Sequence, residues 1–132
     1  MYMLDTNICI YIIKKRPESV FEKFKTLGVN DLFISSIVLS ELEYGVQKSN
    51  YIEKNKLALE IFLSPINIIP YTDIAAEIYG EIRSNLEKTG NIIGPMDLLI
   101  AAHALAENKI LITNNEKEFM RISDLKIENW VN

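Results

Sequence analysis

The chain has 132 residues, of which 48% are apolar and 24% charged, the balance of a folded soluble protein rather than a disordered one. This length is enough for one domain with a sizeable core. The formal net charge of -4 argues, taken alone, against a nucleic-acid partner, because polyphosphates usually bind basic surfaces. The single cysteine (Cys9) and single histidine (His103) exclude an internal disulfide, a Cys/His zinc site and a ribonuclease using two histidines.

Nothing at the start of the chain reads as a secretion signal, and no apolar run approaches the ~20 residues that span a bilayer. The lone cysteine also suits a reducing compartment. We therefore expect a cytoplasmic protein without a membrane partner.

Short runs typical of strands alternate with longer runs typical of helices, without repeats or linkers. This alternation predicts one α/β domain over residues 1–132, with a mainly parallel sheet of about five short strands and helices on both faces. The predicted strands are 2–4, 32–35, 67–70, 109–113 and 125–128; the predicted helices are 8–13, 19–26, 37–48, 51–63, 72–86 and 95–107.

Several acidic residues lie where predicted strands end or predicted helices begin. Asp5 follows the first strand, Glu41 lies near the start of the helix after the second, and Asp97 is in the first turn of the helix that Pro95 opens. Asn114, Asn115, Glu116 and Glu118 follow the fourth strand. Because strand carboxyl ends and helix amino ends share one edge of a parallel sheet, these side chains should converge.

Each acid has an ordinary explanation of its own. Asp5 can cap a helix, Asp97 can favour the positive end of a helix dipole, and Glu41 can be a solvated helix residue. None of these explains three carboxylates at one edge, where they repel each other unless a hard cation such as Mg²⁺ or Mn²⁺ is present. Such a site suits phosphoryl chemistry by metal-activated water.

Four segments, in this order, resemble the PIN-domain nucleases and, more closely, the VapC toxins of bacterial toxin–antitoxin pairs. Together they extend over nearly the whole chain, and the ordered set is far more specific than any one of them. They are residues 3–8 (MLDTNI), 35–45 (SSIVLSELEYG), 94–104 (GPMDLLIAAHA) and 111–119 (LITNNEKEF).

The resemblance implies that Asp5, Glu41 and Asp97 bind Mg²⁺ or Mn²⁺ and catalyse endoribonuclease cleavage, leaving a 5′-phosphate and a 3′-hydroxyl. Many members carry a fourth acid where this chain has Asn115, so the second metal is in question and Glu118 is the nearest substitute.

Neighbouring polar residues are expected to support these acids. Thr6 and Asn7 are predicted to cap the following helix and to contact metal-bound water, while Thr113 and Asn115 orient the acids by hydrogen bonding. Ser40 is either a surface hydroxyl or a substrate contact.

Residues 8–13 (ICIYII) are apolar on every side of a helix, which predicts either a wholly buried helix or a groove for a partner helix. We favour the groove, since the resemblance implies a VapB-type antitoxin and a homodimer. It also implies an RNA substrate, with transfer RNA the class that similar proteins cut.

The remaining candidates have simpler interpretations. His103 and Trp130 are predicted to be structural. Basic residues could form a rim for RNA phosphates, although charged runs are more often solvated: Lys14, Lys15, Arg16, Lys48, Lys54, Lys56, Arg83 and Lys88.

Three other functions are alternatives to this interpretation. A phosphoryl receiver would need an aspartate ending the third strand, which ends in Pro70, and an Asp-x-Asp phosphatase would need a second aspartate where Asn7 stands. A catalytically impaired PIN-like binding module, with Asn115 as the mark of decay, remains the alternative to an active nuclease.

Overall fold

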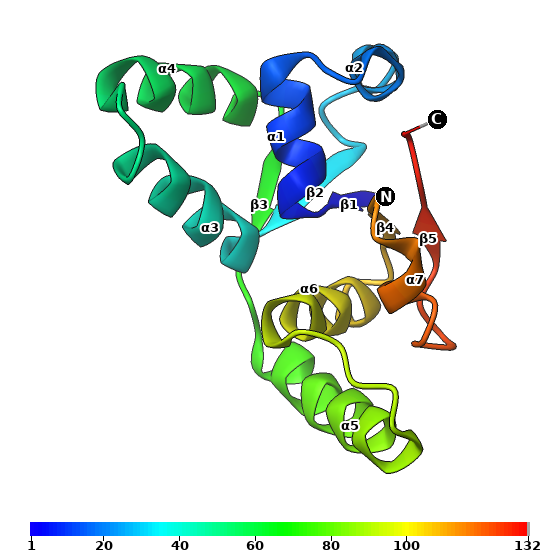
Figure 1. Ribbon diagram of the computed structural model, residues 1–132. Coiled ribbons are helices and arrows are strands. Elements are labelled where there is room, and N and C mark those ends of the chain that lie inside the picture. Colours follow the sequence, from blue (N-terminus) through cyan, green and yellow to red (C-terminus); the bar gives the residue numbers. More distant parts are fainter. Residues whose placement is uncertain (132) are drawn as a thin grey trace.

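A computed structural model describes residues 1–131. Its centre is one fully parallel sheet in the order β3-β2-β1-β4-β5 (Figure 1). The strands are β1 (Tyr2–Leu4), β2 (Leu32–Ser35), β3 (Asn67–Ile69), β4 (Ile110–Ile112) and β5 (Ile127–Glu128). The predicted α/β class and parallel five-stranded sheet are therefore confirmed.

Helices cover both faces of this sheet (Figure 1). The first four pack against one another on one side, while α5 and α6 pack against each other on the other. The helices are α1 (Thr6–Lys14), α2 (Glu18–Lys25), α3 (Ser36–Gln47), α4 (Ile52–Leu63), α5 (Asp73–Thr89), α6 (Pro95–Ala106) and α7 (Glu116–Phe119).

The core follows from the two central strands, which are covered on both faces. Met3 and Leu4 of β1 and Leu111 and Ile112 of β4 are all fully buried, as expected of a parallel sheet between two helical layers. Leu4 is paired with Ile112, so the residues that follow them, Asp5 and Thr113, leave the sheet side by side. The register thus brings the ends of β1 and β4 together.

Helix boundaries agree with the prediction to within a few residues, with one exception. The four-residue helix α7 was not predicted, because so short a segment has no hydrophobic period to detect. In α4, the apolar pair Leu57 and Ile61 is exposed, whereas Leu59 and Phe62 are buried. This helix has apolar residues on two faces, and spacing alone did not show which one meets the core.

The capping prediction for Thr6 and Asn7 was wrong. Asp5 is the residue that caps α1, since its Oδ1 accepts a hydrogen bond from the Ile8 amide at 3.0 Å. Thr6 and Asn7 are the first two helical residues. Their side chains are thus free for other partners.

Within residues 1–131, none of the helices combines the length and the apolar composition needed to cross a lipid bilayer.

Trp130 packs the end of the chain onto the sheet, as predicted. Its ring meets Tyr2 edge-on with centroids 5.6 Å apart, and its Nε1 donates to Glu128 Oε1 at 3.0 Å. Only 5% of Trp130 is exposed. This side chain therefore adds to the backbone pairing that joins the short edge strand β5 to β4.

We expect Trp130→Ala to lower the free energy of unfolding by about 3 kcal/mol, because it removes a buried aromatic contact and leaves a cavity. Urea denaturation would measure the loss. Val29→Ala, at an exposed position, is the control and should change stability by less than about 0.5 kcal/mol. A loss below about 1 kcal/mol for Trp130→Ala would mean that the end of the chain is not anchored by this ring.

Candidate active site

The carboxyl edge of the sheet collects the predicted acids from four separate segments. Asp5 follows β1, Glu41 lies on α3 after β2, Asp97 lies in the first turn of α6, and Glu118 lies on α7 after β4. Asp5 and Glu41 each contribute to the electrostatic environment of Asp97, and Glu118 shares a hydrogen bond with it. The structure therefore brings all four together, although they are up to 113 residues apart in sequence.

Asp5 is the most deeply placed of these acids, with 7% of its surface exposed. Burial raises the pKa of its carboxyl, and the nearby Glu41 charge adds to the rise. Hydrogen bonds from the Thr113 side chain and the Ile8 amide act in the opposite direction. Two hydrogen bonds thus hold this carboxylate in a buried site that disfavours its ionised form.

Glu41 is fixed by a neighbour from a different helix. The Thr6 hydroxyl donates a short hydrogen bond to Glu41 Oε1, which joins the start of α1 to α3 across 35 residues of sequence. The capping role of Asp5 leaves the Thr6 side chain free to make this bond. Thr6 therefore orients an acid instead of capping a helix.

Among the neighbouring acids, Glu118 has the largest effect on Asp97. Burial, followed by the hydrogen bond and charge of Glu118 and then the charges of Asp5 and Glu41, raises the pKa of Asp97 to about 7. Burial and the three neighbouring acids all raise this pKa, which is the behaviour of carboxylates crowded together without a cation. Asp97 is therefore ready to hold a proton in neutral solution.

The segment after β4 positions Glu118. The Asn115 side-chain amide donates to Glu118 Oε2 at 2.7 Å, and the Asn115 backbone amide donates to the buried Thr113 hydroxyl oxygen at 2.9 Å. Asn115 is thus an amide that holds Glu118, an acid of the helix that follows it. Thr113, Asn115 and Glu118 form one hydrogen-bonded unit.

Other candidates lie away from this cluster or face solvent. Asn7 is exposed, and the exposed Ser40 hydroxyl donates back to the Ser36 carbonyl at 3.1 Å. His103 is completely buried, edge-on to Tyr71 with centroids 5.4 Å apart. His103 is therefore a packing residue, as predicted.

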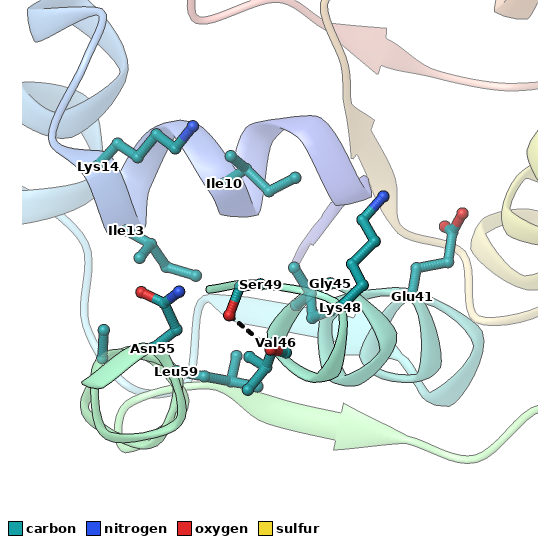
Figure 2. A pocket seen from close by; sticks show the side chains of 12 residues that line it. Ile10, Ile13, Lys14, Glu41, Gly45, Val46, Lys48, Ser49, Asn55 and Leu59 are labelled. Carbon is teal, nitrogen blue, oxygen red and sulfur yellow. Dashed lines mark hydrogen bonds between the residues drawn. The ribbon is translucent and has the colours of Figure 1, made fainter. Parts of the chain in front are cut away.

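The predicted basic rim is not one continuous patch. Lys56 is paired with Glu43 at 2.8 Å, and Arg83 is paired with Glu87 on α5, across the sheet from α3 and α4. Lys14 and Lys48 line the same pocket as Glu41, with Lys48 beside this acid and Lys14 toward the other side of the pocket (Figure 2).

The donor set suits a hard divalent cation, since it consists of carboxylate oxygens, and the pKa values of Asp5 and Asp97 are raised. Within residues 1–131, however, no three His, Cys, Asp or Glu side chains stand close enough to grip an ion without moving. Glu41 and Glu118 are each held by a protein hydrogen-bond donor, Thr6 and Asn115. A cation would have to compete with these donors or share the carboxylates with them.

Beside the acids, a largely apolar groove of about 370 Å³ runs between α1, α3 and α4 (Figure 2). Ile10 and Ile13 of α1 line it, whereas Ile8, Cys9 and Ile12 are buried in the core. Both predictions for this apolar helix are thus partly right, because one face is core and the other opens into a groove.

The opposite wall of the groove was not predicted. It comes from α3 and α4, where the small residues Gly45 and Ala58 leave room between the helices. Two small residues on neighbouring helices are a weak signal, which explains why sequence reasoning missed them. Glu41 stands at one end of the groove, so the groove and the acid cluster meet at this side chain (Figure 2).

The raised pKa of Asp97 predicts a pH-dependent stability in metal-free protein. Between the usual value of 3.8 and about 7, the folded chain binds a proton that the unfolded chain releases, so stability falls as the pH rises through this window. Asp97→Asn lacks this penalty. At pH 8 in EDTA it should be more stable than the original chain by on the order of 1 kcal/mol, after allowing for solvent screening of this half-buried group.

At pH 4 the same substitution should change stability little, because Asp97 is protonated there in the folded state. Urea denaturation at both pH values tests this, with Asp124→Asn at an exposed position as the control. Equal effects of Asp97→Asn on stability at pH 4 and pH 8 would show that the pKa of Asp97 is not raised.

Comparison with known proteins identifies the family. A model of the PIN domain matches residues 2–125. Ribonuclease VapC2 of Rickettsia felis is 53% identical over 98% of both chains, and the tRNA(fMet)-specific endonuclease VapC of Shigella flexneri is 44% identical over 98% of this chain and 97% of its own. The crystal structure of VapBC2 from Rickettsia felis bound to a DNA fragment from their promoter superposes with a TM-score of 0.92, at 52% identity and 98% coverage of both chains. The chain therefore belongs to the PIN-domain family, in which VapC proteins are its near relatives.

Proposed function

We propose that this chain is an Mg²⁺- or Mn²⁺-dependent endoribonuclease, the toxin of a toxin–antitoxin pair, and that a VapB-type antitoxin neutralises it. The observation that carries the proposal is the convergence of Asp5, Glu41, Asp97 and Glu118 at one sheet edge, with the pKa of Asp97 raised to about 7. Its near relatives are named ribonucleases or endonucleases. The retained acids and these relatives argue against an impaired binding module.

Asp5, Glu41 and Asp97 would hold the cation, with Glu118 in the place of the fourth acid. A divalent ion bound there would lower the pKa of a coordinated water and neutralise charge at the scissile phosphate. One ion could satisfy this donor set, and Asn115 in place of an acid weakens the case for a second.

The protein's own groups arrange the reaction around these acids. Thr6 orients the Glu41 carboxylate and Asn115 orients that of Glu118, so neither acid is free to rotate. Hydrogen bonds from Ile8 and the Thr113 side chain hold the Asp5 carboxylate. The Asp97 carboxyl, whose pKa is about 7, can take up or release a proton in neutral solution.

Transfer RNA is the proposed substrate class, supported by the tRNA(fMet)-specific relative. Removing the charges of Asp5, Glu41 and Asp97 from the net of -4 leaves about -1 for the rest of the chain. So nearly neutral a surface should bind RNA only modestly by charge, and recognition would depend on RNA shape.

The groove beside Glu41 is the proposed seat of the antitoxin. Its apolar walls suit the apolar face of an amphipathic helix. The solved VapBC2 structure is that of a toxin–antitoxin pair, which supports such a partner here. A segment in the groove would end beside Glu41 and so could block the acid cluster. A homodimer is also proposed, without an assignment of its surface.

Asp5→Asn and Asp97→Asn should each lower the rate of RNA cleavage at least about 100-fold, because each removes one charge of the cation site. Asn also caps helices, so Asp5→Asn keeps the start of α1 intact. Asp73→Asn, at an exposed position on α5, is the control and should retain full activity.

Single-turnover cleavage of transfer RNA and of an unstructured RNA measures both the activity and the substrate class. EDTA should abolish cleavage and Mn²⁺ should restore it. Undiminished activity in either Asn variant, or in EDTA, would exclude the proposed mechanism.

Ile13→Glu should weaken antitoxin binding about 100-fold or more while leaving RNA cleavage intact, because it places a charge on the apolar wall of the groove. Ile74→Glu on α5, already exposed and outside the groove, is the matched control. Binding can be followed by calorimetry with a purified VapB-type antitoxin. Equal affinity of the Ile13→Glu variant and the original chain would place the antitoxin elsewhere.

A further inference from the structure

Asp97 and Glu118 share a hydrogen bond, yet the segments that carry them are not self-supporting. Helix α6 has Gly94 at its N-cap position and so has no side-chain cap, and α7 is four residues long and likewise has no side-chain cap. A helix of one turn has little stability of its own. The relative placement of the two acids therefore depends on contacts from other residues.

Arg121 makes a contact of this kind. Its Nη1 donates to the carbonyl oxygen of Ile92 at 2.7 Å, joining the loop before α6 to the segment after α7 across 29 residues of sequence. The Arg121 backbone amide donates to the Glu118 carbonyl oxygen at 3.1 Å. One residue is thus bonded both to the loop that leads into the Asp97 turn and to the residue that carries the second carboxyl.

Packing around Arg121 holds in place the segment that donates to the Ile92 carbonyl. Arg121 and Ile122 border a small cavity of about 110 Å³ whose walls also include Ile82 and Leu86 of α5 and Leu105 of α6. The segment after α7 therefore lies on the α5–α6 pair. Since a guanidinium is always charged, its hydrogen bond to a carbonyl is stronger than one between neutral groups.

We propose that Arg121 is a positioning residue that holds the Asp97 segment against the Glu118 segment and thereby sets the geometry of the acid cluster. The inference rests on the proposed ribonuclease function. Arg121 is not assigned a contact with RNA, and binding of an RNA phosphate by its exposed guanidinium is the competing explanation.

Three variants separate these explanations. Arg121→Gln removes the charge and shortens the reach, Arg121→Lys keeps a charged donor, and Ile92→Ala leaves the accepting carbonyl in place at an exposed position. In transfer-RNA cleavage, Arg121→Gln should lower kcat about 10-fold with KM changed by less than about 2-fold, because misplaced acids act on the reaction and not on RNA binding. Arg121→Lys should recover most of kcat, and Ile92→Ala should match the original chain.

Hydrogen exchange of backbone amides provides a readout independent of activity. Amides of residues 91–98 should exchange at least about 5-fold faster in Arg121→Gln than in the original chain or in Ile92→Ala. If the original chain cleaves no RNA, the proposed function fails, and this exchange experiment still tests the tether by itself.

Two kinetic results would overturn the inference. A raised KM with unchanged kcat in Arg121→Gln would mean that Arg121 binds RNA, and unchanged kinetics with unchanged exchange would mean that it holds nothing. If Arg121→Gln fails to fold, Arg121→Lys decides: exchange of residues 91–98 and kcat near the original values support the tether, whereas lost activity in a well-folded Lys variant contradicts it.

Discussion

Repulsion among carboxylates is the constraint on which the site depends. The parallel sheet brings Asp5, Glu41, Asp97 and Glu118 to one edge, and none of the groups that shift the pKa of Asp97 is positively charged. The fold counters part of this cost with hydrogen bonds from Thr6, Asn115 and the Ile8 amide. The repulsion that these hydrogen bonds do not offset raises the pKa of Asp97 to about 7. A divalent cation would relieve the conflict, so the strain in the protein and its proposed chemistry have one cause.

The same arrangement links activity to its proposed control. Glu41 belongs to the acid cluster and also stands at one end of the apolar groove between α1, α3 and α4. A partner segment bound in the groove would therefore contact Glu41, a residue of the acid cluster. Helix α1 connects the two regions, since its first residue, Thr6, holds Glu41 while Ile10 and Ile13 line the groove.

The fold class and the convergence of the acids could be predicted from the sequence, because strand and helix periods and the geometry of parallel sheets follow local or general rules. The details that depend on tertiary contacts could not be predicted. Spacing alone left two apolar faces possible for α4, and Leu57 and Ile61 proved to be exposed. The division of roles in Asp5-Thr6-Asn7 was also hidden. All three residue types can begin a helix, and only the position of Glu41, 35 residues after Thr6, decides which of them makes the cap.

Calorimetric titration of the metal-free protein with Mn²⁺, in buffers of different ionisation enthalpy at pH 6, tests the central claim most directly. If the carboxylates lie together and repel one another, Mn²⁺ should bind and displace close to one proton, because Asp97 is mostly protonated at that pH. Asp97→Asn should abolish the proton release and weaken binding. Absence of Mn²⁺ binding, or binding without proton release that Asp97→Asn leaves unchanged, would contradict the account.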